Sequence, residues 1–254
     1  MFSSNIGFSL YSGKPKVLIK KGRGMKKTYF AITVVILLSL ILSATNACAI
    51  NKWEALVEES GKVLSEIQQM PDQHIPENLM EGCSAIAIFP NTISAGLGIG
   101  GKYGQGIIMV RDNEGKWSPP ALFTIAGGSI GWQIGGQATD FVLLIMNRRS
   151  VDGILQGQFK LGADADVAAG PVGRSAEAST DIQLKGGILS YSRSRGLFAG
   201  VKLEGAVITQ HWDGDAELYN KSISARDILL NNAVKMPKSA DSVIKVLSKY
   251  PYKK

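Results

Sequence analysis

The apolar positions at the start of the globular part of the chain predict an amphipathic helix. Between Trp53 and Ile67 they recur at helical spacing, which places them on one stripe: Trp53, Leu56, Val57, Val63, Leu64 and Ile67. The polar positions carry four glutamates against two lysines: Glu54, Glu58, Glu59 and Glu66, with Lys52 and Lys62. We therefore expect a helix that packs on the domain and exposes an acidic surface.

The middle of the chain has the pattern of β-strands. Residues 84–89 alternate small and branched side chains, and glycines recur from Ile93 to Val110, which predicts two closely approaching strands with a turn near residues 102–105. A second hairpin is expected around the turn Asp112–Gly115. It leads into a glycine-rich strand ending near Gly136, and the apolar run 140–147 is interpreted as a further strand.

The remaining elements are short. Helices are expected after Pro76, from Ser150 with that serine as the N-cap, after Ser224, and over residues 241–247. Strands over 182–191 and 197–209 flank a basic turn at 192–196. The predicted fold class is α+β: a strongly curved, largely antiparallel, glycine-rich and barrel-like sheet with flanking N- and C-terminal helices.

The first 49 residues resemble an export signal with an upstream extension. Met25 precedes two lysines, an apolar run over residues 30–42 and the segment Ala47-Cys48-Ala49. The run is shorter than a bilayer span, so we expect cleavage after Ala49, leaving residues 50–254 as a single domain. Lipid attachment at Cys48 is the alternative, although the leucine expected three positions earlier is absent.

Removal of this segment changes the charge of the protein. The whole chain has 28 basic and 21 acidic residues, but seven of the basic ones and none of the acidic ones precede Ile50. The expected mature chain is therefore balanced, which argues against nucleic acid as a partner. It retains one cysteine, Cys83, and so is not expected to form an intrachain disulfide.

Two glycine motifs resemble catalytic or nucleotide-binding signatures. Residues 96–101 match G-x-G-x-x-G, and Lys102 nearly completes a P-loop, but another strand is expected where the phosphate-binding helix should begin. Ser129 lies in a G-x-S-x-G pattern, which requires a strand-to-helix elbow and a nearby histidine. Both motifs are interpreted as glycine-rich strand packing, and a Ser129 hydrolase is kept as the third functional alternative.

Two aspartates form a weak candidate cation site. Asp164 and Asp166 would lie on one face of a strand, although no complete calcium loop accompanies them. We interpret them as polar residues of a turn, and we expect neither a metal nor another cofactor.

The basic turn is the strongest candidate for ligand contact. It combines Arg193 and Arg195 with Leu197 and Phe198, a mixture that suits phosphate headgroups above an apolar layer. A solvated hairpin tip with its aromatic residues in the core explains the same residues, and the sequence leaves both interpretations open.

Several blocks of the chain together resemble the SYLF domain family over roughly Trp53 to Leu247. The most specific blocks are GKWSPP at 115–120, TDFV at 139–142, AAGPVGR at 168–174 and SYSRSRGLFAGV at 190–201. The resemblance implies phospholipid binding without enzymatic activity, with phosphoinositides as ligands of some eukaryotic members and actin as a partner of others. The N-terminal helix here is acidic where such members have a basic one, so phosphoinositide specificity is not expected.

We therefore expect a non-catalytic phospholipid-binding domain of the bacterial periplasm or envelope. Arg193 and Arg195 are the first candidates for phosphate contact, Leu197 and Phe198 for apolar contact, and Arg174 and Lys202 are second candidates. The expected partner is an anionic phospholipid surface, and an exported protein would not meet actin. The alternative is an envelope structural or protein-interaction module without lipid specificity.

Overall fold

The computed structural model describes residues 51–173, 187–194 and 196–253, which belong to one compact unit, Ile50–Lys254. The expected export signal lies outside the described residues. Within the described part, no helix combines the length and apolar character needed to cross a membrane.

Helix α2 (Lys52–Gln68) confirms the expected amphipathic helix. Its N-cap, Asn51, accepts a hydrogen bond from the backbone N–H of Trp53, and its apolar stripe is buried. Gly61 lies against the last helix, α8 (Asp241–Leu247), where an added Cβ would be 2.1 Å from Ser242 Oγ. The short 3₁₀ helix η3 (Lys238–Ala240) precedes α8, so the two ends of the unit pack together.

The centre of the fold is a long antiparallel ribbon of β1 (Ala85–Val110) and β2 (Ala121–Ile145). The strands pair from Ala85 opposite Ile145 to Ile108 opposite Ala121, so the turn expected at residues 102–105 is wrong and β1 continues through it. The turn at Asp112–Gly115 is confirmed, because the Gly115 N–H donates to the Asp112 carbonyl.

The glycines of β1 permit close approach instead of chain reversal. The ribbon folds back on itself, and a Cβ on Gly106 would lie 2.1 Å from the Ile88 carbonyl oxygen. A Cβ on Gly104 would lie 2.2 Å from Thr92 Oγ1. The side-chain-free positions therefore allow the two halves of β1 to pack face to face.

The remaining strands extend the ribbon into a half-barrel. The order is β3 (Phe159–Lys160), β7 (Val207–Gln210), β2, β5 (Ile188–Ser194) and β4 (Val167–Ala169), with β1 on β2 and β6 (Leu197–Gly200) on β5. Among the described residues these seven strands pair antiparallel except for β4 with β5. The expected curved, largely antiparallel sheet is confirmed.

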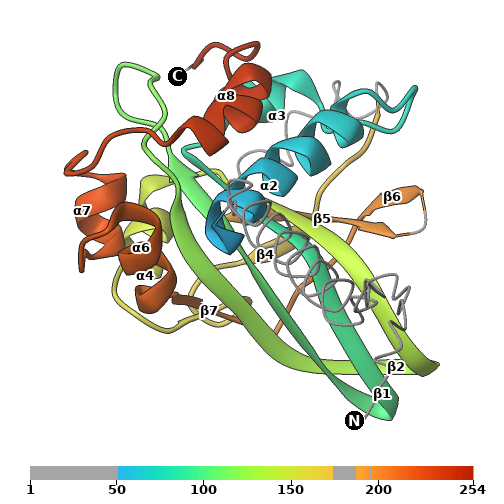
Figure 1. Ribbon diagram of the computed structural model, residues 1–254. Coiled ribbons are helices and arrows are strands. Elements are labelled where there is room, and N and C mark those ends of the chain that lie inside the picture. Colours follow the sequence, from blue (N-terminus) through green and yellow to red (C-terminus); the bar gives the residue numbers. More distant parts are fainter. Residues whose placement is uncertain (1–50, 174–186, 195, 254) are drawn as a thin grey trace, which may run out of the picture. The chain divides into compact units, whose positions relative to one another are not determined.

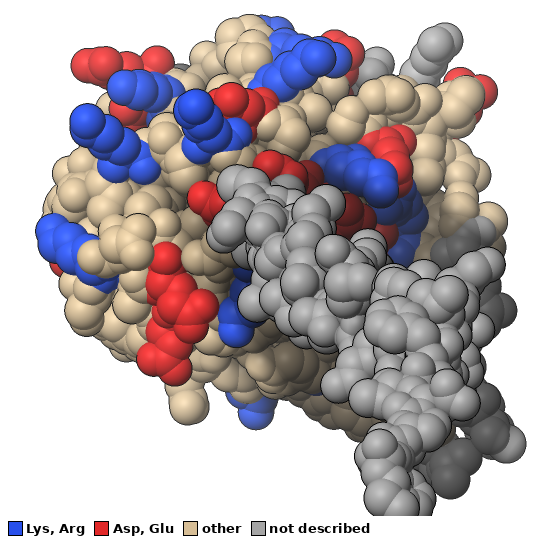
Figure 2. All heavy atoms as spheres, in the orientation of Figure 1, with Lys and Arg blue, Asp and Glu red and all other residues tan. Residues whose placement is uncertain are grey.

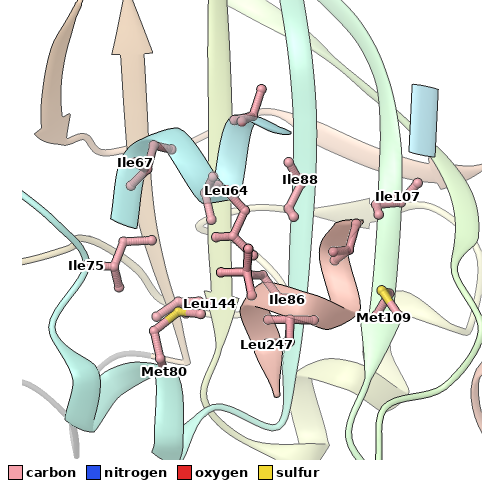
Figure 3. Packing of buried hydrophobic residues seen from close by; sticks show 14 of the residues in the cluster. Leu64, Ile67, Ile75, Met80, Ile86, Ile88, Ile107, Met109, Leu144 and Leu247 are labelled. Carbon is pink, nitrogen blue, oxygen red and sulfur yellow. The ribbon is translucent and has the colours of Figure 1, made fainter. Parts of the chain in front are cut away.

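The sheet separates two hydrophobic clusters, which define its two faces. The outer face carries Ile86, Ile88 and Leu144 and packs against α2, α8 and α3 (Glu77–Gly82), as Figure 3 shows. The concave inner face carries Phe89, Phe123 and other residues that pack against α4 (Arg148–Ile154) and α7 (Ala225–Leu229). In Figure 1, β1 and β2 run together well beyond these helices.

The shorter helices agree only in part with expectation. Helices α3, α7 and α8 are confirmed, and Ser224 caps α7 by accepting from the Asp227 N–H. Helix α4 begins at Arg148 and is capped by Asn147, because the Asn147 side chain accepts from the Ser150 N–H. Helix α6 (Trp212–Tyr219) was not expected from the pattern, and His211 caps it through Nδ1.

Candidate functional site

The basic turn forms the tip of the hairpin between β5 and β6. Strand β5 continues to Ser194, which pairs with Leu197, so the turn is shorter than expected. Gly196 has a φ of +80°, a left-handed conformation that glycine adopts without strain. The connection is therefore tight and presents few residues at its tip.

Arg193 lies on the outer face and is held by two carboxylates. Its Nε donates to Asp140 Oδ2 at 2.9 Å, and its guanidinium also contacts Glu66 of α2, leaving 15% of the side chain exposed. Burial opposes its charge, but the hydrogen bonds to Glu66 and Asp140 together raise the pKa of Arg193. Instead of reaching outward as expected, this residue fastens α2 to the sheet.

Phe198 is also buried beneath the elements that cover the outer face, the face on which Arg193 lies. It is buried and stacks on Tyr191 with ring centroids 5.4 Å apart. A Cβ on Gly170 would lie 2.1 Å from the Tyr191 ring, and one on Gly200 would lie 1.9 Å from the Gly170 carbonyl oxygen. The glycines in two of the family-like sequence blocks therefore serve close packing around Tyr191.

Leu197 is the candidate that the structure leaves at the surface. It is 74% exposed at the hairpin tip. Lys202 is also exposed, with Nζ 2.6 Å from Glu204 Oε1. Arg174 and Arg195 lie outside the described residues, so their positions stay a prediction.

The ribbon beside this hairpin is nearly free of charge. Apart from tyrosine, β1 contains one ionisable residue, Lys102, and β2 contains one, Asp140. Asp140 is paired with Arg193. Ile93 and Tyr103 are 61% and 54% exposed on β1. Elsewhere, acidic and basic side chains are interspersed on the visible face of the described part, as Figure 2 shows.

The sequence did not identify these ribbon residues as candidates, because their distinguishing feature is a lack of charged side chains. No acidic or basic residue occurs from Trp117 to Thr139, a stretch that reads equally well as buried strand. Only the sheet pairing shows that part of it lies beyond the covering helices.

The weaker catalytic and cation candidates acquire no supporting geometry. Ser129 lies within β2, so its backbone forms no strand-to-helix elbow. Asp164 and Asp166 are exposed, and Asp164 Oδ2 accepts from the Lys160 N–H in a turn. The residues that the structure describes contain no group of three or more histidine, cysteine or acidic side chains placed for a metal.

Fold and site together define an α+β module built on one folded ribbon and a half-barrel sheet. A family model described as "Ysc84: Las17-binding protein actin regulator" matches residues 126–250. The chain belongs to this family, the Ysc84 or SYLF family.

Three relatives illustrate the similarity. An SH3 domain-containing protein of Schizosaccharomyces pombe is 34% identical over 75% of this chain and 46% of its own length. Protein YSC84 of Saccharomyces cerevisiae is 34% identical over 69% of this chain and 38% of its own. The human SH3 domain-containing YSC84-like protein 1 is 31% identical over 77% and 58%. The chain therefore spans about half the length of the curated relatives it matches.

Proposed function

We propose that this domain is exported and binds the surface of phospholipid membranes without catalysis. The observation that carries the proposal is the exposed Leu197 beside a charge-poor ribbon that itself exposes Ile93 and Tyr103. Large exposed apolar side chains favour contact with an apolar partner. The family description, which names a binding protein and actin regulator, supports a non-catalytic role.

The exposed apolar side chains favour attachment. Complete transfer of one large apolar side chain from water contributes about 1.5–3 kcal/mol. Leu197, Ile93 and Tyr103 are each more than half exposed, so each would contribute part of this free energy where it enters the membrane.

The sheet edges limit how deeply the ribbon would enter. Among the described strands, β7 pairs with β2 only up to Ala126 and β5 only from Asp140 onward. The backbone groups of β2 between these points need water or headgroups, because unpaired peptide groups are costly in hydrocarbon. The attachment we propose is therefore at the headgroup level.

The contact residues follow from exposure. Leu197 enters the apolar layer, while Arg195, Arg174 and Lys202 remain candidates for headgroup contact. Arg193 and Phe198 support the hairpin from within, through the ion pairs and ring stacking described above.

The test is co-sedimentation of the Ile50–Lys254 unit with anionic phospholipid vesicles. Leu197→Glu should weaken binding about tenfold or more, because it removes apolar area and adds repulsion. Met236→Glu is the matched control, since Met236 is another exposed apolar residue and lies outside the proposed surface. Equal binding by both variants would contradict the role of the hairpin tip.

A protein partner is the second candidate function. It is favoured by the family description, which names a Las17-binding protein and actin regulator. For an exported chain we propose an envelope protein in place of actin, docked on the same ribbon. Failure of the wild-type protein to bind vesicles of any composition would favour this alternative.

A further inference from the structure

Lys102 of β1 lies on the inner face of the ribbon. Lys102 is on the same side of β1 as Gly104, which packs toward Thr92, and its Nζ lies 5.6 Å from the centroid of the Phe141 ring. It is half-buried, and burial lowers the pKa of Lys102. The ammonium group therefore loses part of its hydration inside the half-barrel.

Hydroxyl-bearing residues of β2 and β5 share the inner face with Phe141. Ser192 is directly opposite Phe141 in the register of β2 and β5, and both face inward. Thr139 and Ser194 lie two residues away along their strands and so share that face. Gln137 Nε2 donates to Ser194 Oγ, which leaves the serine O–H free to donate to a ligand.

No described carboxylate balances the lysine on this face. β1, β5 and β6 contain no acidic residue, and Asp140 of β2 points to the outer face, where it holds Arg193. Within the described ranges, no ion pair or hydrogen bond joins Lys102 Nζ to another residue. One ammonium and three hydroxyl groups thus form a set of donors that suits an anion.

We propose that Lys102, Thr139, Ser192 and Ser194 bind the phosphate group of a phospholipid headgroup. Four donors match the several acceptor oxygens of a phosphate better than they match a halide. One cation fits the single negative charge of a phosphodiester. Leu197 pairs with Ser194 and lies on the same face, so an acyl chain would continue from the phosphate along this exposed side chain.

This inference rests on the proposed function, and the experiment separates the two. The Ile50–Lys254 unit is mixed with phosphatidylcholine vesicles, with vesicles that also contain phosphatidylglycerol, or with inorganic phosphate. Binding is measured by co-sedimentation, and acetylation of each lysine by mass spectrometry. The variants are Lys102→Gln, Lys102→Arg, the hydroxyl-deleted pair Thr139→Val with Ser192→Ala, and the control Lys245→Gln at an exposed lysine of α8, with thermal melting to confirm folding.

The expected result is protection of Lys102 from acetylation by the phosphatidylglycerol vesicles. Lys102→Gln should bind them about ten- to a hundredfold more weakly, the hydroxyl-deleted pair severalfold more weakly, and Lys102→Arg and Lys245→Gln nearly as wild type. Vesicle binding that survives Lys102→Gln, with Lys102 still acetylated, would overturn this site and leave the proposed function standing. Protection by inorganic phosphate without vesicle binding would identify a free-phosphate site and overturn the lipid assignment. If the protein does not bind the vesicles and Lys102 is not protected, both this site and the proposed function are overturned.

Discussion

Arg111 fastens the C-terminal segment to the sheet, and its replacement tests how the unit is held together. The side chain is 1% exposed. One terminal nitrogen donates to the Glu81 carbonyl at 2.7 Å and the other to the Tyr250 carbonyl at 3.0 Å. The guanidinium carbon lies 4.4 Å from the centroid of the Trp117 ring and 5.3 Å from that of Tyr252. Burial lowers the pKa of Arg111, and Cys83 and the two groups Tyr252 and Glu81 oppose this shift.

The magnitude of an Arg111→Met substitution follows from these contacts. A hydrogen bond from a charged donor is worth about 1.5–3 kcal/mol, and two such bonds to partly buried carbonyl groups are lost. Relief of the desolvation of the cation offsets part of this loss. We expect the free energy of unfolding to fall by about 3–5 kcal/mol.

The assay is urea unfolding followed by tryptophan fluorescence, with limited trypsin digestion at Lys249 as a local readout. Arg111→Lys should lose an intermediate amount, because one ammonium cannot replace the two-pronged guanidinium. Arg149→Met is the control, since Arg149 is exposed. A loss below about 1 kcal/mol for Arg111→Met, with cleavage at Lys249 no faster than in the wild type, would refute this account of Arg111.

Three further predictions concern stability. Burial raises the pKa of Asp215 from 3.8 to about 7 despite two hydrogen bonds. As the pH rises between these values, the wild type should therefore lose up to about 4 kcal/mol of stability relative to Asp215→Asn. Urea unfolding at several pH values measures this difference, and a difference that does not change with pH would refute the prediction. Gly106→Ala should lower the melting temperature clearly, whereas Gly128→Ala, with open space around its Cβ, should not; equal melting of both would contradict the close-approach argument. In urea unfolding, Arg193→Leu should lower the stability of the unit by about 3–5 kcal/mol and Glu66→Gln by at most about 1 kcal/mol. Similar losses for the two variants would show that the ion pair between Arg193 and Asp140 does not contribute more than the one between Arg193 and Glu66.

Local patterns predicted much of the fold. The stripe from Trp53 to Ile67 identified α2, because helical periodicity is encoded within one segment. The turn at Asp112–Gly115 and the cap Ser224 were likewise recognisable from adjacent residues. Such features depend on chemistry within a few positions along the chain.

The errors came from residues whose role depends on distant partners. The glycines of β1 resembled a hairpin turn, but Gly104 and Gly106 are small because the other half of the same strand lies against them. Helix α6 was missed because it is short and contains Gly214, so its propensity signal is weak.

The candidate site divides in the same way. The sequence placed Arg193 in the basic turn and Leu197 directly after it, as neighbouring candidates for ligand contact. The exposure of Arg193 and Leu197 differs because strand alternation turns Arg193 toward Asp140 and Glu66 and leaves Leu197 at the surface. The proximity of Lys102 to Phe141 and Ser192 depends on how the ribbon folds over, which no local pattern encodes.

The most direct test of the central claim is binding of the Ile50–Lys254 unit to vesicles of zwitterionic and of anionic phospholipid at low and moderate salt. The account predicts stronger binding to the anionic vesicles, weakened but not abolished by salt, because ionic contacts are screened while the apolar contacts of Leu197 are not. No binding to either kind of vesicle would contradict membrane attachment and direct attention to a protein partner.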